Sequence, residues 1–238
     1  MHKLSVCVNY FFYIFAILTF YLFTPTIFCM LQIRQVLLRQ PDLSMITEAH
    51  LSAAENSRMH EFKLPNLLCG NCPSFANRWA CPPYTSAMED PIKTKKVSNL
   101  ITLKVIPAGK QVSAKDIIDD AREHLDFIFY NLEATQENSS LLLAGSCSCP
   151  ISNNCSRRRN FLCARPEKMR YSLESLGYDV VKIAKEIFNI DILWQSDGLP
   201  QYFTLVYAIC SDCDMSKKIS EALTRYLGDN LKLKYIQS

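Results

Sequence analysis

Apolar and polar side chains alternate between Leu100 and Ile106. A period of two residues is typical of a β-strand, whose successive side chains point to opposite faces of a sheet. A second candidate strand, from Ser140 to Ala144, is a continuous apolar run that stops at Gly145. Such a run is the pattern of a strand covered on both faces. We therefore expect the second strand to lie in the centre of a sheet, with the residues after Gly145 leaving its end.

Three segments repeat their apolar residues at helical spacing. The clearest begins after Ser113, which forms a motif resembling a capping box with Asp116. Its apolar positions are Ala114, Ile117, Ile118, Ala121, Leu125 and Ile128. A second helix is predicted after Asp179, and a third runs through Ile219 and ends at Gly228.

Shorter patterns complete the predicted elements. Strands are expected near 191–195, 201–209 and 231–235. Residues 40–68 are expected to form a short helix that leads into the first cysteine group. The resulting order is βαβ, then a cysteine-rich stretch, then αββαβ. This order predicts an α/β (α+β) fold, in which a mixed β-sheet is packed by helices and carries two cysteine-rich metal-binding loops. We expect residues 45–238 to form a single domain.

The first 44 residues differ in character from the rest of the chain. Residues 4–33 contain no charged side chain. At about 1.5 Å per residue, a helix of this length would cross a hydrocarbon core of about 30 Å. The segment is either a membrane anchor, with the domain facing the cytoplasm, or the product of a misplaced start, with the true start at Met30 or Met45. The expected location is cytoplasmic in both cases, and contact with a membrane is expected only through residues 4–33.

Composition limits the possible functions only weakly. The chain has 238 residues, of which 49% are hydrophobic and 21% charged, as in a globular protein. Its net charge of +3 is too small to indicate nucleic acid as a partner. There is no serine–histidine–aspartate order, phosphate loop or dinucleotide fingerprint in a suitable context. The sequence therefore gives no support for a hydrolase, kinase or dehydrogenase, and it assigns no reaction.

Seven of the eleven cysteines fall into two groups. The first group is Cys69, Cys72 and Cys81, and the second is Cys147, Cys149, Cys155 and Cys163. Thiolates are preferred ligands of zinc and of iron–sulfur clusters. Short spacings in a chain of this size indicate metal ligands in a reducing compartment rather than disulfides. Alone, the first group is one ligand short of a four-coordinate site, whereas the second has enough thiolates to close one.

The spacing in the second group favours an iron–sulfur cluster over zinc. A Cys-x-Cys pair is less typical of zinc knuckles than Cys-x-x-Cys, and the long intervals around Cys155 suit a loop that wraps a cluster. A [4Fe–4S] cluster is the first candidate, with an electron-transfer or redox role and an electron-transfer partner. A structural zinc module that binds a protein or nucleic-acid partner is the alternative. We expect Trp79 to pack beside the first group and shield the metal from water.

A resemblance to a known family rests on several motifs in combination. These are Cys69-x-x-Cys72 leading to Trp79-x-Cys81-Pro82-Pro83, Ala144-Gly145-x-Cys147, Cys163-x-Arg165-Pro166 and Arg170-x-Ser172-x-Glu174-x-x-Gly177-x-Asp179-Val180. From about Asn66 to Cys210 the chain resembles a family of cysteine-rich prokaryotic proteins of unknown function, described as predicted metal-binding proteins. The resemblance implies a metal site on the matched cysteines. The family usually has Cys-x-x-Cys-x-x-Cys in the second group, so the displaced Cys155 is a departure.

Two further features have competing interpretations. Cys210 and Cys213 are separated by two residues before a predicted helix, where a thiol pKa is lowered. They are a candidate redox pair for a thiol oxidoreductase, an additional metal pair or inert thiols.

The arginines near the second group are the other ambiguous feature. The run 157–159 is either an anion site or, as we expect, a solvated loop. Arg165 and Arg170 are expected to pair with Glu174 or Asp179, or to neutralise the charge of a cluster.

Overall fold

The computed structural model describes residues 45–65, 68–84, 89–107, 113–147, 155–194 and 198–237. All of them belong to the unit that runs from Ser44 to Ser238. The predicted anchor at 4–33 and the cysteine Cys149 lie outside the described residues. Within these ranges, no helix combines the length and the apolar character needed to cross a membrane.

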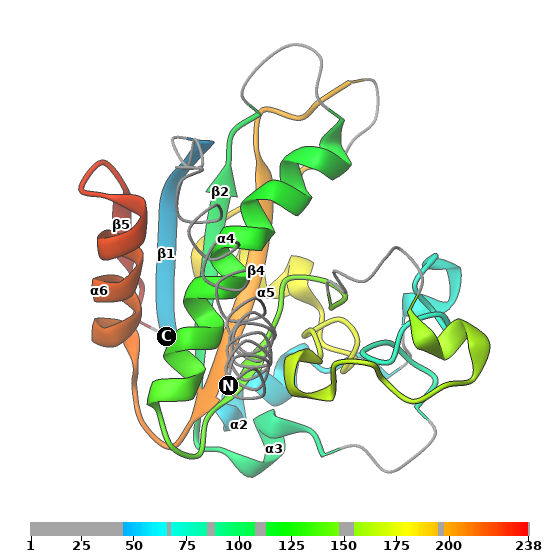
Figure 1. Cartoon of the computed structure of the whole chain (residues 1–238). Helices are drawn as coiled ribbons and strands as arrows, with labels where there is room; N and C mark the ends of the chain where they lie inside the picture. The colour runs from blue at the N-terminus through cyan, green and yellow to red at the C-terminus, as the bar shows by residue number, and fades with distance from the viewer. Residues whose placement is uncertain are drawn as a thin grey trace, which may run out of the picture. The chain divides into compact units, whose positions relative to one another are not determined.

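A mixed sheet forms the centre of the described unit (Figure 1). Its five strands are β1 (Ile46–Glu55), β2 (Val97–Val105), β3 (Ser140–Leu142), β4 (Phe203–Ser211) and β5 (Lys232–Tyr235). Their order across the sheet is β3-β4-β2-β1-β5. β1 and β5 are parallel, and the other neighbouring strands are antiparallel. The predicted α+β fold with a mixed sheet is therefore confirmed.

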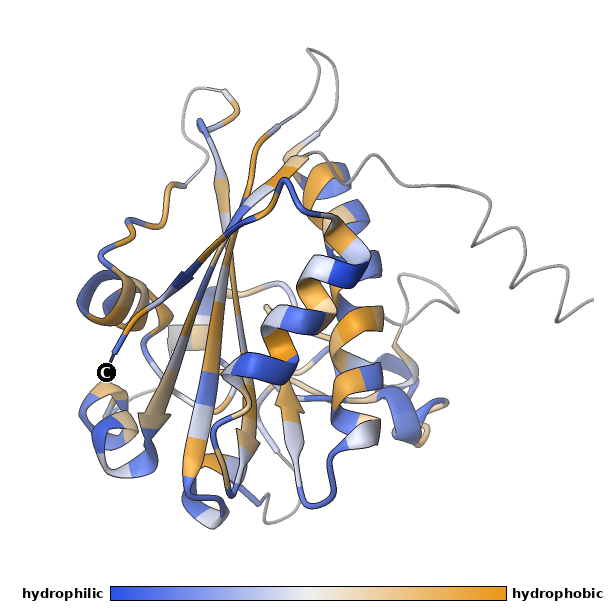
Figure 2. Cartoon of the chain, turned by 90° about the vertical axis from the view of Figure 1, so that its left-hand side faces the viewer, coloured by the Kyte–Doolittle hydropathy of each residue, from blue (hydrophilic) through white to orange (hydrophobic). Residues whose placement is uncertain are grey.

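Helices cover both faces of this sheet (Figure 2). The longer ones are α4 (Ala114–Thr135), α5 (Val180–Phe188) and α6 (Ser216–Leu227), and the short ones are α2 (Asn56–Met59) and α3 (Pro91–Thr94). The predicted caps are present, since Ser113 Oγ accepts a hydrogen bond from the Asp116 N–H at 3.2 Å and Asp179 Oδ1 accepts one from the Lys182 N–H at 3.0 Å. The three helices predicted from apolar spacing are confirmed.

β1 occupies a segment that was expected to be helical, and that expectation was wrong. Its ten residues include alanine and glutamate, which favour helices when taken alone. Pairing with β2 on one side and β5 on the other buries Ala49, Leu51 and Ala54 almost completely. The burial that a strand gains from its neighbours outweighs local propensity here. Only α2, directly after β1, agrees with the predicted short helix.

β3 lies at the edge of the sheet, so the prediction of a central strand was wrong. Its apolar run is buried for another reason. The next residue, Leu143, pairs with Ser172 in an isolated bridge, and its N–H donates to the Tyr171 carbonyl at 2.8 Å. The segment around Tyr171 therefore covers the open edge, and Leu141 and Leu142 are buried without a second strand beside them.

Residues 191–194 contain no strand, in contrast to the sequence prediction. Tyr202 Oη donates to the Asp191 carbonyl at 3.1 Å, and Lys185 pairs with the Asp191 carboxylate at 2.7 Å. Trp194 is exposed. These contacts tie the segment to its neighbours in the chain, so its apolar residues do not join the sheet.

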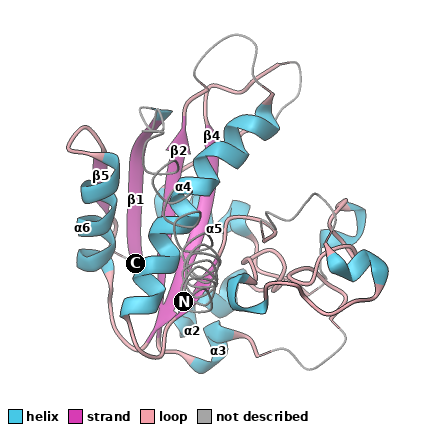
Figure 3. Ribbon diagram, in the orientation of Figure 1, coloured by secondary structure: helices cyan, strands magenta, loops and turns pink. Residues whose placement is uncertain are grey.

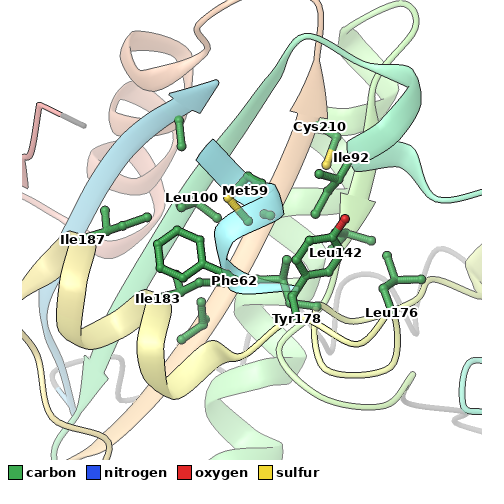
Figure 4. Packing of buried hydrophobic residues seen from close by; sticks show 14 of the residues in the cluster. Met59, Phe62, Ile92, Leu100, Leu142, Leu176, Tyr178, Ile183, Ile187 and Cys210 are labelled. Carbon is green, nitrogen blue, oxygen red and sulfur yellow. The ribbon is translucent and has the colours of Figure 1, made fainter. Parts of the chain in front are cut away.

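The face of the sheet under α5 buries a continuous apolar cluster (Figure 4). Met59, Phe62, Leu100 and Ile183 belong to it, and each is essentially inaccessible to solvent. Cys210, in β4, points into the same cluster. Burial on this scale is the main favourable contribution to folding, and it gives the segments that follow β3 and α2 a rigid base.

Candidate metal centre

Two cysteine-bearing segments lie on the same side of the sheet, beyond the edge that ends with β3 (Figure 1). We call residues 68–84 the first cysteine segment, and residues 145–147 with 155–170 the second cysteine segment. Both consist mainly of loop and short turns (Figure 3). Because little regular structure holds them, their specific contacts determine where the thiols lie.

Tight turns shape the first cysteine segment. It begins with the 3-10 turn η3 (Leu68–Asn71), and the Cys72 N–H donates to the Cys69 carbonyl at 2.9 Å. The Cys81 N–H donates to the Arg78 carbonyl at 3.1 Å. These bonds bring cysteines that are separated in sequence back toward one another.

Side chains then tie this segment to residues 174 and 175. The Cys69 thiol lies 3.7 Å from the Glu174 carbonyl oxygen. Tyr84 Oη donates to the Ser175 carbonyl at 3.0 Å. Both ends of the first cysteine segment are thus fixed against the scaffold.

A buried polar network positions the start of the second cysteine segment. Arg122, on α4, donates from Nη2 to the Ser146 carbonyl at 2.7 Å and lies 3.4 Å from Asp126 Oδ2. Tyr207 Oη donates to Asp126 Oδ1 at 2.8 Å. Gly145 adopts φ +79°, a conformation that L side chains rarely take. The network therefore holds the peptide that leads directly into Cys147.

Arginine side chains join the two segments. Arg157 Nη1 donates to the Arg78 carbonyl at 2.7 Å, and its guanidinium also donates to the carbonyls of Cys81 and Pro83. In the other direction, Arg78 Nη1 donates to the Cys147 carbonyl at 2.8 Å. Hydrogen bonds from a charged donor are among the stronger ones in proteins. The predicted solvated loop is correct for two exposed arginines of the triplet and wrong for Arg157.

Trp79 contributes to the same junction. Its Nε1 lies 3.3 Å from Ser156 Oγ and 3.2 Å from the Phe161 carbonyl oxygen. The Arg157 guanidinium lies 5.5 Å from the centre of its ring, within cation–π range. Trp79 is half-buried and bridges the two cysteine segments.

The thiols of the two segments share one electrostatic environment. Cys81, Cys147 and Cys155 are buried, and the structure records no disulfide for any cysteine it describes. Burial raises the pKa of Cys81 to about 12, and the neighbouring thiols of Cys147, Cys72 and Cys69 add to the increase. Burial also raises the pKa of Cys147, to which Cys155 and Cys163 contribute. Cys147 is thus a neighbour of thiols from both groups.

The donor chemistry fits a metal that prefers sulfur, although the thiols are not in a coordinating arrangement. Among the described residues, no three histidine, cysteine, aspartate or glutamate side chains are placed to hold a metal ion. Their raised pKa values keep the thiols of Cys69, Cys81 and Cys147 protonated at neutral pH. A metal replaces those protons and draws the thiolates together.

Glu174 is half-buried beside the first cysteine segment, and its Oε2 atom is inaccessible to solvent. Its Oε2 atom has no hydrogen-bond partner in the described part of the chain, and burial raises the pKa of the carboxyl group. A buried unpaired carboxylate oxygen is unfavourable unless a charge or a proton compensates it. A proton or a positively charged ligand beside this oxygen would therefore be favourable.

The two arginines of the family motif have partners other than those expected. Arg170 pairs with Glu133 at 2.9 Å, and Arg165 lies 3.3 Å from Glu167. The predicted pairing with Glu174 or Asp179 was therefore wrong. Asp179 instead caps α5.

The Cys210–Cys213 pair does not have the features of a redox site. Cys210 is fully buried in β4, and burial raises its pKa to about 12. Its sulfur lies 3.8 Å from Ser98 Oγ. The attacking cysteine of a thiol oxidoreductase is accessible and has a lowered pKa. The structure therefore gives the oxidoreductase interpretation no support.

Several residues that shape the centre were not identified from the sequence. The hydrogen bond from Arg157 to the Arg78 carbonyl joins residues that are 79 positions apart in the sequence. No local sequence pattern predicts such a contact. Arg122 did carry a signal. It lies between the apolar positions of the predicted helix, with Asp126 four residues later, and a charged pair on a buried face indicates a buried network.

Free thiols from two loops on an α+β scaffold define a thiolate-rich candidate metal-binding protein. Residues 66–208 match the family described as "Predicted metal-binding protein (DUF2284)". The match covers more than half of the chain, so the chain belongs to this family. Neither a curated protein nor a solved structure gave a significant match.

Proposed function

We propose that the two cysteine segments together bind an iron–sulfur cluster and that the protein carries electrons. The proposed ligands come from Cys69, Cys72, Cys81, Cys147, Cys149, Cys155 and Cys163. The observation that supports a shared centre is the junction between the segments, where Arg157 donates to the Cys81 carbonyl and Arg78 Nη1 donates to the Cys147 carbonyl at 2.8 Å. The thiols of Cys147, Cys72 and Cys69 are the electrostatic neighbours of the Cys81 thiol. These are four thiols, the number that holds one cubane cluster or one zinc ion.

The spacing and burial of the thiols favour a cluster over zinc. The Cys147-x-Cys149 pair is less typical of zinc knuckles than Cys-x-x-Cys, and Cys81 and Cys147 are shielded from water. Bound here, a cluster would supply a one-electron carrier. Arg78 and Arg157 place positive charge beside the thiols, which would offset the negative charge of a thiolate-ligated centre.

A structural zinc site is the second candidate, and the loop character of both segments supports it. Segments with so few ladder hydrogen bonds gain stability from a metal that ties their ends together. In that case the metal would hold the two segments in place for a partner without carrying electrons.

Metal analysis combined with spectroscopy distinguishes the two candidates. Full-length protein purified without oxygen should contain iron and acid-labile sulfide in equal amounts, about four of each per cubane cluster. It should be coloured, and reduction should give a paramagnetic resonance signal. Stoichiometric zinc in a colourless protein would favour the structural site. A protein with neither metal would overturn the proposal.

A further inference from the structure

We propose that the surface formed by Arg158, Arg159, Phe161, Leu162 and Lys168 is a docking site for an acidic electron-carrier protein. We call this surface the basic–apolar face. The proposal rests on the proposed function, because it adds a partner to the same centre.

Two adjacent apolar side chains stand out from this part of the molecule. Leu162 is 86% exposed and Phe161 is 63% exposed. Their backbone is held in place, since the Phe161 N–H donates to the Ser156 carbonyl at 3.2 Å and its carbonyl accepts from Trp79 at 3.2 Å. Exposed apolar side chains ringed by polar groups are typical of interaction sites.

Positive charge is concentrated in the stretch of sequence that carries these side chains. Residues 155–170 contain one acidic residue, Glu167, and six cationic ones, namely Arg157, Arg158, Arg159, Arg165, Lys168 and Arg170. Their net charge is +5 in a chain whose total is +3, so the other residues together carry −2. This segment therefore differs in sign of charge from the rest of the chain, and excess positive charge attracts an acidic partner and orients it.

Three of the six cations are available to a partner. Arg157 is occupied by backbone carbonyls, Arg165 by Glu167 and Arg170 by Glu133. Arg158, Arg159 and Lys168 are exposed, and within the described ranges none of them forms an ion pair. Arg159 and Lys168 lie over the aromatic rings of Phe161 and Tyr130, which limits their motion.

The position of the face fits a partner that exchanges electrons with the centre. Leu162 directly precedes Cys163, one of the proposed ligands, and the Cys163 side chain is half-buried. Complexes that exchange electrons are commonly weak and bury little surface, so a small face can serve as their docking site. A docked protein would lie against the segment that carries the ligand.

The same features fit other macromolecules less well. A nucleic-acid site of useful affinity neutralises about six to ten phosphates, whereas three free cations are present here. A membrane-binding helix presents a broad apolar face, whereas this surface offers only Phe161 and Leu162. A protein surface with carboxylates around a small apolar centre matches the basic–apolar face best.

The test is a binding titration of the full-length protein with a small acidic ferredoxin. Reversing the charge with Arg158→Glu/Arg159→Glu, or removing the apolar centre with Leu162→Ser, should weaken binding about tenfold or more, and added salt should weaken it in the wild type. Lys217→Glu and Leu199→Ser are matched controls, since Lys217 is exposed on α6 and Leu199 is partly exposed in a separate loop. Both controls should bind within about twofold of wild type.

Two results would overturn the docking proposal. One is that the wild type does not bind the ferredoxin, or that the face variants bind it as tightly as the wild type does. The other is tighter binding to anionic vesicles or to an oligonucleotide, with loss in the same variants. Metal content, measured on each variant, separates this proposal from the proposed function. If the protein contains no metal but binds the ferredoxin with the predicted loss in the face variants, only the proposed metal centre is refuted. If the protein contains metal but does not bind the ferredoxin, only the docking proposal is refuted.

Discussion

Replacing Arg157 with methionine tests the junction between the two cysteine segments. The substitution keeps an unbranched apolar stem beside Trp79 and removes the guanidinium. That group donates to the carbonyls of Arg78, Cys81 and Pro83. Each hydrogen bond to a charged group contributes roughly 1.5–3 kcal/mol in favourable cases. Because Arg157 is only partly buried, water can replace part of this hydrogen bonding in the variant. We therefore expect the docking of the two cysteine segments to weaken by about 2–3 kcal/mol in total.

The loss should appear as weaker metal binding. If both segments supply ligands, metal binding requires them to be docked, and 2–3 kcal/mol corresponds to about a 30- to 150-fold weaker affinity. Competition with a chelator of known affinity measures this directly, in anaerobic solution, with zinc or cobalt as the probe.

Arg158→Met is the matched control for this substitution. Arg158 is the adjacent residue, it is exposed, and its side chain makes no contact recorded in the described part of the chain. Its replacement should leave metal affinity within about twofold of wild type. Equal affinities for Arg157→Met and Arg158→Met would refute the idea that the junction supports the metal centre.

Three further substitutions test other parts of the structure. Burial lowers the pKa of His50 below its ordinary 6.5, so the unfolded chain takes up the proton first and stability falls as pH drops below about 6.5. The His50→Gln variant should lose less stability than the wild type when urea unfolding is compared between pH 7.5 and pH 5. The same dependence of unfolding free energy on pH in both proteins would contradict this prediction. Tyr207→Phe removes a 2.8 Å hydrogen bond to buried Asp126 and should lower the free energy of unfolding, measured in urea, by about 1–3 kcal/mol. Cys210→Ser should cost a similar amount by burying a hydroxyl but should retain the bound metal, as elemental analysis would show.

The fold was predictable where local pattern and tertiary environment agree. α4 was predicted because Ser113 caps it and its apolar residues repeat at helical spacing over many turns. β2 was predicted because apolar and polar side chains alternate from Leu100 to Ile106, and β4 because a strand pattern follows the turn signal at Asp197-Gly198. β1 was not, because its strand form depends on two neighbours that are distant in sequence.

The site was predictable only as a set of donors. The spacing of Cys69, Cys72 and Cys81 identified a thiolate site, because short spacings place sulfurs in one loop. The sequence did not reveal that Cys147 is a neighbour of the first group or that Arg157 joins the segments. Both facts depend on contacts between segments that are distant in sequence and meet beyond β3.

The central claim is that both cysteine segments contribute to one metal centre. The most direct test is the metal content of three serine variants, Cys81→Ser, Cys147→Ser and Cys210→Ser, each purified without oxygen beside the wild type. We predict that Cys81→Ser and Cys147→Ser both lose most of the metal found in the wild type, whereas Cys210→Ser retains it. Full metal content in Cys81→Ser or in Cys147→Ser would contradict a shared centre.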